Sequence, residues 1–171
     1  SPTMKSEWGL SSDMDERVDG HEVWLAECAK IGFTPEPRQF EAGTRTSQDA
    51  ASQLGCEVAN IAKSIVFKGQ AGAVVVITSG ANRVERKRKV KRLLGYKPSM
   101  TEADYIIENT GYAPGGVPPF GHLKPCTILM DEDLFQYETV WGAGGSADTV
   151  FPIDPEYLLK LSGAIVGDVK Q

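Results

Sequence analysis

Hydrophobic residues in this chain recur at two spacings, one typical of helices and the other typical of strands. Trp24, Cys28 and Ile31 stand at i, i+4 and i+7, so they predict a helix over residues 13–31 with these side chains on its buried face. Further helices are predicted where an apolar stripe follows a capping residue, such as Thr101, or precedes a glycine. They cover residues 46–54, 84–94, 101–108 and 154–161.

Runs of β-branched and apolar residues predict the strands. Residues 60–68 and 73–78 form two such runs around a glycine-bearing turn, which is typical of a β-hairpin. Because hairpins are mixed with helical crossovers, the order of elements favours a mixed-sheet α/β domain over a doubly wound parallel sheet. No internal repeat or linker divides the chain, so we expect one domain. Shorter runs predict strands at residues 38–41, 127–130, 139–141, 149–151 and 164–166.

Composition narrows the class of protein. The chain has 171 residues, of which 41% are hydrophobic, and this supports one domain with a sizeable core. No stretch approaches the ~20 apolar residues that span a membrane. The net charge of −5, from 18 basic and 23 acidic residues, would by itself disfavour a nucleic-acid partner.

The charge is unevenly distributed along the chain. Segment 83–92 holds seven basic residues and one acid, Glu85, so it carries +6 while the rest of the chain carries −11. A basic stripe on an acidic body is typical of a surface that binds RNA or another polyanion. The alternative is a solvated helix face that only keeps the protein in solution. The basic residues are Arg83, Arg86, Lys87, Arg88, Lys89, Lys91 and Arg92.

The cysteines and the first residues indicate a reducing compartment. Cys28, Cys56 and Cys126 are widely spaced, and with only two histidines in the chain a Cys/His zinc site is not expected. Residues 1–15 show no basic region followed by an apolar one, so no secretory signal is predicted. We therefore expect reduced thiols in a cytoplasmic protein.

Lys63 is the first candidate for a functional side chain. In the strand predicted over residues 60–68 it falls on the same face as Ile61, Ile65 and Phe67. A lysine in line with three large apolar side chains must reach solvent, find an anionic partner or line a cavity. It is interpreted either as a phosphate or carboxylate ligand in a pocket or as a strand-end lysine in solvent.

The loop of residues 110–122 is the second candidate, because it holds four glycines and three prolines. Glycine permits unusual backbone angles and close approach of a ligand, while proline limits flexibility. Such a loop can fix backbone donors near a developing oxyanion, although it could also be a structural turn. His122 at its end is either a substrate or proton-transfer residue or a plain surface histidine. The candidate donors are the N–H groups of Gly115, Gly116, Val117, Phe120 and Gly121.

Together these features resemble the YbaK/prolyl-tRNA synthetase-associated domain family, which comprises aminoacyl-tRNA editing domains. The resemblance is carried by the lysine-bearing run 59–67, the strand 73–77 and the Gly-Pro loop 111–122, in that order. It covers residues 15–167 and leaves residues 1–14 as an N-terminal tail expected to be flexible. It implies an α/β single domain with a mixed, partly barrel-like β-sheet surrounded by helices.

The resemblance implies a free-standing trans-editing deacylase that hydrolyses the ester of a mischarged tRNA, at family level Ala- or Cys-tRNA(Pro). Water would attack with the help of a hydroxyl of the substrate itself, in agreement with the lack of a nucleophile–base triad in the sequence. No cofactor and no metal are implied. The resemblance places Lys63 near the terminal adenosine and its phosphate. The aminoacyl group would be held by the loop residues Gly115, Gly116, Val117, Pro118 and Pro119.

The resemblance also suggests neighbours and partners for this pocket. Segment 83–92 would contact the acceptor stem of the mischarged tRNA, and prolyl-tRNA synthetase is a further partner that the resemblance allows, whereas neither a membrane nor DNA is expected. A non-catalytic tRNA-, nucleotide- or synthetase-binding regulatory module of the same fold remains the alternative, because Gly142 stands where many relatives carry Ser. The suggested pocket neighbours are Asn60, Phe67, Tyr112, Phe120, Gly121, His122 and Asp148.

Overall fold

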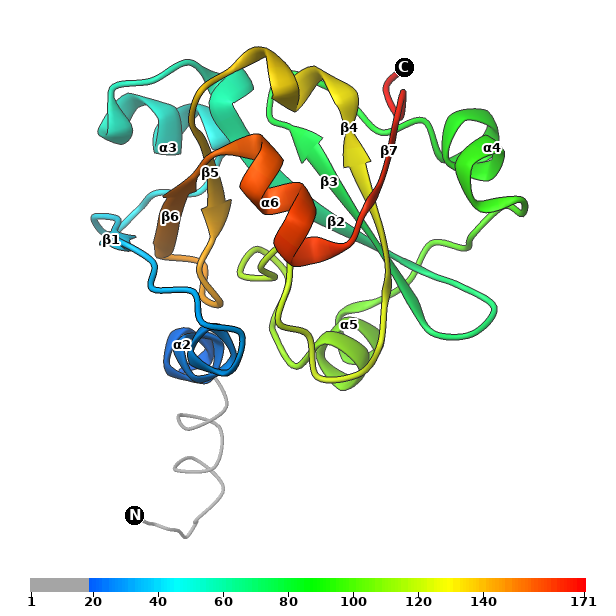
Figure 1. Cartoon of the computed structure of the whole chain (residues 1–171), viewed down its shortest axis with the longest axis horizontal. Coiled ribbons are helices and arrows are strands. Elements are labelled where there is room, and N and C mark those ends of the chain that lie inside the picture. Colours follow the sequence, from blue (N-terminus) through cyan, green and yellow to red (C-terminus); the bar gives the residue numbers. More distant parts are fainter. Residues whose placement is uncertain (1–18) are drawn as a thin grey trace, which may run out of the picture.

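A seven-stranded mixed sheet of order β1-β6-β5-β2-β3-β4-β7 organises the described part of the chain, residues 19–171 of a computed structural model (Figure 1). Parallel pairs join β2 to β5, β3 to β4 and β4 to β7, and the other neighbouring strands are antiparallel. The predicted mixed sheet is therefore confirmed. The strands are β1 (Arg38–Gln39), β2 (Ile61–Lys68), β3 (Ala73–Ser79), β4 (Thr127–Asp131), β5 (Val140–Ala143), β6 (Thr149–Ile153) and β7 (Ile165–Gly167).

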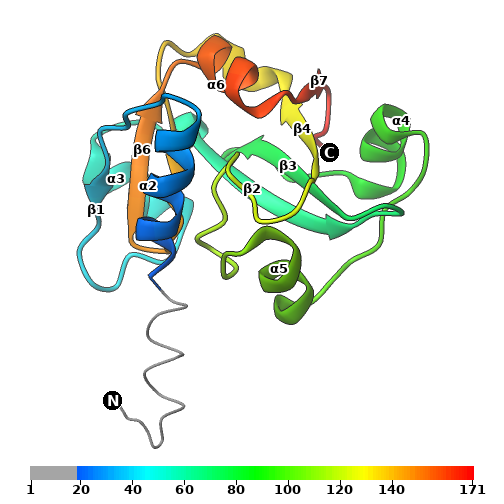
Figure 2. The same ribbon diagram turned by 60° about the horizontal axis from the view of Figure 1, so that its bottom comes forward.

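Helices surround this sheet, and their ends follow the expected capping rules in two cases. Thr46 and Asp49 form a capping box at the start of α3, and Asp154 caps the first backbone amides of α6. In Figure 2, α2 lies alongside β6, and Trp24 of this helix packs against Phe151 of the strand. The helices are α2 (Gly20–Lys30), α3 (Ser47–Leu54), α4 (Lys91–Leu94), α5 (Ala103–Thr110) and α6 (Pro155–Ser162), with shorter helical turns at Val58–Asn60, Arg86–Val90 and Glu132–Gln136.

Three local predictions need correction. Ile31 is 49% exposed rather than buried, because α2 ends at Lys30 and Ile31 lies beyond its last turn. Thr101 does not cap α5, since the chain stays extended through Glu102 and the helix begins at Ala103. The basic helix predicted from residue 84 begins at Arg86 as a π-type turn that continues into α4. The predicted tail 1–14 and the start of the first helix lie outside the described residues.

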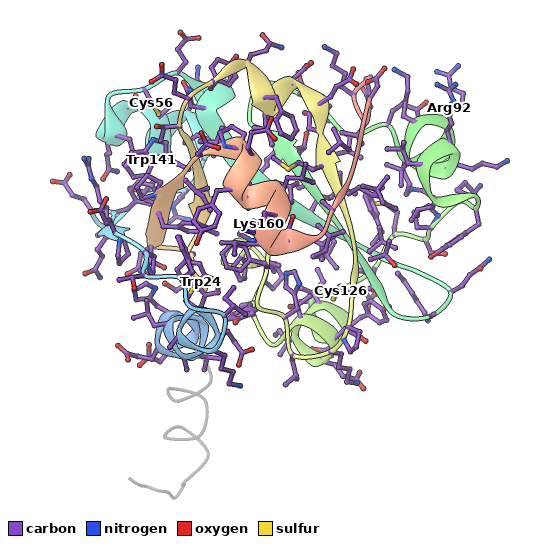
Figure 3. All side chains as sticks on the ribbon, viewed as in Figure 1. Trp24, Cys56, Arg92, Cys126, Trp141 and Lys160 are labelled. Carbon is purple, nitrogen blue, oxygen red and sulfur yellow. The ribbon has the colours of Figure 1, made fainter. Side chains whose placement is uncertain are left out.

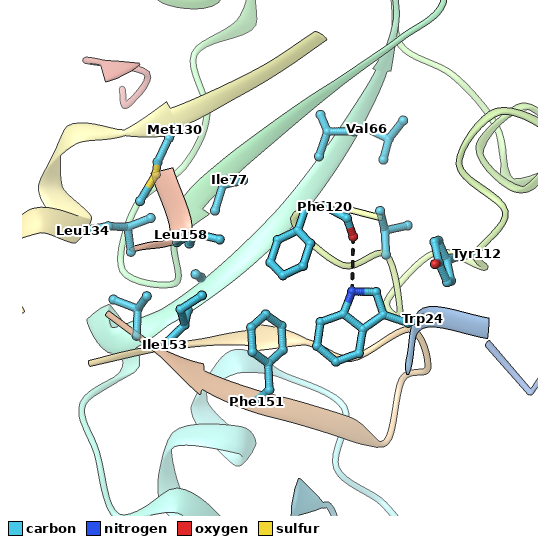
Figure 4. Packing of buried hydrophobic residues seen from close by; sticks show 14 of the residues in the cluster. Trp24, Val66, Ile77, Tyr112, Phe120, Met130, Leu134, Phe151, Ile153 and Leu158 are labelled. Atoms are coloured by element: carbon cyan, nitrogen blue, oxygen red, sulfur yellow. Dashed lines mark hydrogen bonds between the residues drawn. The ribbon is translucent and has the colours of Figure 1, made fainter. Parts of the chain in front are cut away.

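The largest apolar cluster joins α2, the loop after α5 and β6 (Figure 4). The ring centroid of Trp24 lies 4.4 Å from that of Phe151, and the Trp24 Nε1–H donates to the backbone oxygen of Phe120 at 3.2 Å. This bond ties the Gly-Pro loop to α2. A helix at one end of the domain thereby helps to hold the loop in place.

Cys28, Cys56 and Cys126 are free thiols, and Figure 3 shows Cys56 well separated from Cys126. Within residues 19–171, the helices are too short or too polar for any of them to cross a bilayer.

Candidate functional site

Lys63 lies in a gap between two elements that cover the same face of β2. On one side of it, Ile61 packs beneath α3 against Ala50. On the other side, Phe67 packs beneath the basic segment against Val90. The partly buried Lys63 forms no ion pair or side-chain hydrogen bond with another residue of the described chain. Instead it lines two cavities, one on each side of it.

The cavity of about 470 Å³, here the smaller hollow, is built from parts remote in sequence. It lies between the residues that lead into α3, the strands β2, β5 and β6, and the loop residues Gly115 and Val117. Its lining within residues 19–171 includes the cations Arg45 and Lys63 but no Asp, Glu, His or Cys. The other residues with polar side chains in its lining are Thr44, Thr46, Ser47, Ser64, Trp141 and Thr149.

The smaller hollow opens where β5 leaves β2. The two strands pair only through Ile61 and Ala62, whereas at the far end of β2 the backbone of Lys68 bonds Ser99 on the same edge. Because alternate residues of a strand direct their backbone groups to the same edge, Ser64 presents its N–H and C=O to this open stretch. The Ser64 Oγ is also buried and has no hydrogen-bond partner among residues 19–171. A buried polar atom without a partner is costly, and the alternation of side chains along β2 directs this hydroxyl to the face opposite Lys63, with Ala62 and Val66.

Three hydrogen bonds hold the Gly-Pro loop in its conformation, two of them within the loop and one from α2. The Tyr112 hydroxyl donates to the backbone oxygen of Gly121 at 2.6 Å, and His122 Nε2 bonds the backbone oxygen of Pro118 at 2.7 Å. The third is the bond from Trp24 to Phe120. Four of the suggested pocket neighbours take part in these bonds and line neither cavity. They are Tyr112, Phe120, Gly121 and His122.

Burial shifts the pKa values of two of these groups. It raises the pKa of Tyr112, which keeps the hydroxyl as a hydrogen-bond donor. It lowers the pKa of His122, and the bond to the Pro118 oxygen opposes this only partly. His122 is thus held as a neutral ring at pH 7, with its Nε2 engaged in the loop.

Three of the predicted oxyanion donors, Gly115, Gly116 and Val117, differ in whether their N–H is already bonded. The N–H of Gly116 already donates to the oxygen of Ala113 at 3.0 Å, so it is committed within the loop. Gly115, with φ +89°, and Val117 line the smaller hollow, and neither N–H has an acceptor in the described chain. A Cβ on Gly116 would lie 2.7 Å from the Cα of Ser146, which explains why glycine is required where the loop meets the β5–β6 turn.

The remaining suggested neighbours are dispersed. Asn60 donates from Nδ2 to the oxygen of Thr139, which ties the start of β2 to the segment before β5. Phe67 belongs to the core and lines the other cavity. Asp148 is exposed in the β5–β6 turn, and hydrogen bonds from Gln39 and Ser146 lower its pKa. Pro118 and Pro119 are buried within the loop.

The cavity of about 740 Å³, here the larger hollow, lies on the other side of Lys63. Its floor is apolar and includes Ile65, Phe67 and Val84, with Met100 at 68% exposure. Lys63 and Ile65 line both cavities, so the basic segment flanks the lysine in space as well as preceding the loop in sequence. The cations of its wall are Arg83, Arg86, Lys87 and Arg88.

The basic segment carries less free charge than its sequence indicates. Lys89 pairs with Asp168, and Arg88 pairs with Glu85 at 2.8 Å. Arg86 donates to the backbone oxygen of Pro98 at 2.8 Å. No ion pair within residues 19–171 engages the other four cations, which are Arg83, Lys87, Lys91 and Arg92. Figure 3 shows Arg92 on α4, at the opposite side of the view from Trp141, which lines the smaller hollow.

The sequence did not single out Arg45, Ser64 or Trp141, although all three line the smaller hollow. The position of Ser64 beside Lys63 in a predicted strand was the only available signal. Nothing in the local pattern indicates that β5 departs at Ala62 or that the residues before α3 return to β2. These residues could be recognised only once the sheet was assembled.

Comparison with known proteins gives a consistent result. The profile of the aminoacyl-tRNA editing domain family matches residues 41–161. The chain is 30% identical over 124 residues to the uncharacterised protein YwhH of Bacillus subtilis, covering 72% of this chain and 79% of that one. It is 26% identical over 146 residues to EbsC of Enterococcus faecalis, named as a candidate Cys-tRNA(Pro)/Cys-tRNA(Cys) deacylase, covering 85% and 89% of the two chains.

A solved structure has the same fold. It is described as a candidate trans-editing enzyme for prolyl-tRNA synthetase and superposes with a TM-score of 0.84 at 38% identity. The match covers 89% of this chain and 97% of that one.

Proposed function

Because this chain belongs to the aminoacyl-tRNA editing domain family, we propose that it is a trans-editing deacylase that hydrolyses the ester of a mischarged tRNA. The observation that carries the proposal is the Lys63 ammonium, which no residue of 19–171 pairs with and which lines two cavities. Two relatives of similar length support it, since one is named for deacylation of Cys-tRNA(Pro) and the other for trans-editing. Those names also favour prolyl-tRNA synthetase as the enzyme whose errors are corrected.

The smaller hollow suits the aminoacyl end of such a substrate. Small side chains, including Ala50, Ala62 and Ala143, surround a space in which Gly115 and Val117 keep their N–H groups unengaged by the described chain. Backbone donors held in advance stabilise an oxyanion that forms during ester hydrolysis. We propose Ala or Cys on tRNA(Pro) as the substrate, and the relative EbsC is named for the Cys ester.

The chemical step is assigned to water and to the substrate's own ribose. Within residues 19–171 the smaller hollow is lined by no Asp, Glu, His or Cys that could act as a base or nucleophile. The hydroxyl next to the ester would orient the water that adds to the carbonyl carbon. The carbon–oxygen bond to the ribose then breaks, and the released ribose oxygen takes up the proton. Lys63 would bind the adjacent phosphate or ribose and set the position of the ester.

The rest of the tRNA would be held mainly by charge. Arg83, Lys87, Lys91 and Arg92 present cations that no described carboxylate engages. Such contacts release counterions from RNA and make binding depend on salt. We propose that this surface meets the acceptor stem.

A panel of charged tRNAs tests the proposal. The pure protein is incubated with Ala-, Cys-, Ser-, Thr- and Pro-tRNA(Pro), and release of the amino acid is followed. We expect hydrolysis of at least one mischarged ester while Pro-tRNA(Pro) persists. Release from none of them would overturn the proposal, and tRNA binding without release would identify a binding module instead.

Lys63→Ala is the matching variant, for which we expect kcat/KM to fall about a hundredfold or more with the fold intact, because the ester loses its positioning group. Lys124→Ala is the control, since that lysine is exposed and its carboxylate partner, Glu108, lies 3.8 Å away. Equal activity of the two variants would remove Lys63 from the site.

A further inference from the structure

The helical part of the basic segment is too short to hold its own conformation. It consists of the π-type turn Arg86–Val90 and the four-residue helix α4. Isolated helices this short are unstable in water, so the shape must come from contacts with the rest of the domain. Val90 is fully buried and belongs to the same apolar cluster as Val169, which lies far later in the chain. The residues around Val169 therefore help to shape the basic segment.

Residues 168–171, here called the strap, lie near α4 at the red end of the ribbon and run antiparallel to the start of the basic segment (Figure 1). The Glu85 N–H donates to the Val169 oxygen at 2.7 Å, and the Gln171 N–H donates to the Arg83 oxygen at 2.9 Å. One antiparallel bridge lies between these two bonds. The strap therefore fixes the backbone from which the basic segment starts.

Glu85 extends this contact into the helical turn. Its carboxylate accepts hydrogen bonds from the amides of Lys87 at 2.9 Å and Arg88 at 3.2 Å, so it caps the turn. The residue that the strap holds by its N–H is thus the residue that orients the first amides of the turn.

Two ion pairs fasten the strap on either side. Asp168 pairs with Lys89 of the turn, and the Lys89 Nζ also donates to the Lys170 oxygen at 3.1 Å. Lys170 pairs at 2.6 Å with Asp133, which follows β4 and also accepts from Asn82 at 2.9 Å. The hydrogen bonds from these two lysines lower the pKa values of their carboxylate partners, which therefore stay charged at pH 7. The strap is thus tied both to the basic segment and to the central sheet.

We infer that Asp168 and Lys170 are positioning residues for RNA binding, because they lock the strap to the basic segment and thereby set the orientation of its free cations. Neither residue lines a cavity beside Lys63, so both act through the basic segment. Arg83 and Lys87 project from the stretch that the strap fixes, and neither has an ion-pair partner within residues 19–171. Cations arranged in advance lose less conformational freedom on binding, so Asp168 should favour RNA although it is itself negative. That the RNA is tRNA rests on the proposed function.

Asp168→Asn tests the inference, because position and charge predict changes of opposite sign. If charge alone mattered, removing one acid and releasing Lys89 would strengthen binding to RNA. We expect instead that uncharged tRNA(Pro) binds about two- to tenfold more weakly, the cost of ordering one long side chain anew on binding. The amides of residues 86–94 should exchange hydrogen faster than in the native protein, while those of β3 should not.

Glu138→Gln is the matched control, since it removes an equal charge at an exposed position outside both cavities and outside every ion pair of residues 19–171. It should bind tRNA at least as tightly as the native protein and leave the exchange of residues 86–94 unchanged. Asp168→Glu keeps the carboxylate and should restore both native binding and native exchange. The double variant Lys89→Met and Asp168→Asn leaves the net charge unchanged and should bind as weakly as Asp168→Asn alone.

The inference is overturned if Asp168→Asn binds tRNA as tightly as the native protein or more tightly, or if exchange in residues 86–94 stays native. Faster exchange throughout β3 would also overturn it, because the weaker binding would then follow from a loss of global stability. A native protein that binds tRNA but deacylates none would overturn the proposed function alone and leave these binding results unaffected.

Discussion

The two cavities beside Lys63 are built on different principles. The smaller hollow is assembled from four parts of the chain, and besides Arg45 and Lys63 it is lined by several hydroxyl residues and by two residues of a loop that hydrogen bonds brace. Apart from Lys63, the larger hollow takes its charge from one continuous basic segment, in which Arg83, Lys87 and Arg88 are exposed. The first can select a ligand by shape, and the second can attract one by charge. Selectivity and affinity should therefore respond to different substitutions.

The shape of the smaller hollow should be broken most severely by Gly116→Ala. The new Cβ would lie 2.7 Å from the backbone of Ser146, so the loop must move away from the β5–β6 turn. We expect kcat/KM to fall about a hundredfold, as for misplacement of a reacting group by about 1 Å. Unfolding should become easier by about 1–3 kcal/mol. Deacylation kinetics and denaturant unfolding measure the two effects.

Ala113→Ser, in the exposed part of the same loop, is the control and should change neither quantity. Native-like kinetics in Gly116→Ala would show that the contact between loop and turn does not shape the site.

The charge of the basic segment, which forms the wall of the larger hollow and continues beyond it, should be tested by the double substitution Lys87→Ala and Lys91→Ala. We expect about tenfold weaker tRNA binding at low salt and a shallower salt dependence, since two phosphate contacts are lost. The rate at saturating substrate should stay the same, because neither lysine lines the smaller hollow.

The double variant Lys124→Ala and Lys160→Ala changes the net charge equally at exposed positions outside both cavities. If it weakens binding as much, the attraction comes from net charge and not from the basic segment.

Ser64→Ala should separate stability from activity. Removing a buried hydroxyl without a partner should leave the free energy of unfolding unchanged or raise it by up to about 1 kcal/mol. Because the buried Ser64 hydroxyl lies on the face of β2 opposite Lys63, kcat/KM should stay within about twofold of the native value. Thermal unfolding and deacylation kinetics are compared on the same preparation. A larger fall in kcat/KM would show that Ser64 contacts the substrate.

His122→Gln should have the smallest effect on activity. His122 bonds Pro118 within its own loop and does not line the smaller hollow, so the rate and its pH profile should be those of the native protein. Stability should behave differently. Burial lowers the folded-state pKa of His122, so the unfolded chain binds the proton more readily, and stability should fall as pH drops below the ordinary value of about 6.5.

The substitution should remove that component of the pH dependence, as measured by thermal unfolding between pH 5 and 8. If the pH–rate profile of His122→Gln differed from that of the native protein, His122 would instead be a proton-transfer residue.

Local pattern predicted the central hairpin and its lysine correctly. The apolar runs around a glycine-bearing turn became β2 and β3, and the period of two placed Lys63 in line with Ile61 and Phe67. The reason is that strand alternation and turn chemistry depend on neighbours in sequence. The same logic found the Gly-Pro loop. It could not say which loop side chains point inward, and Tyr112 and His122 proved to brace the loop.

The sequence by itself determined the elements, the lysine on its strand face, the loop composition and the position of the basic run. Only the tertiary structure decided that α3 and the basic segment cover the same face of β2 and leave a gap at Lys63. It likewise decided that Asp168 neutralises Lys89 and that β5 leaves β2 open beside Ser64. These features depend on pairings between residues far apart in the chain, whereas periodicity reports only on residues that are close in it.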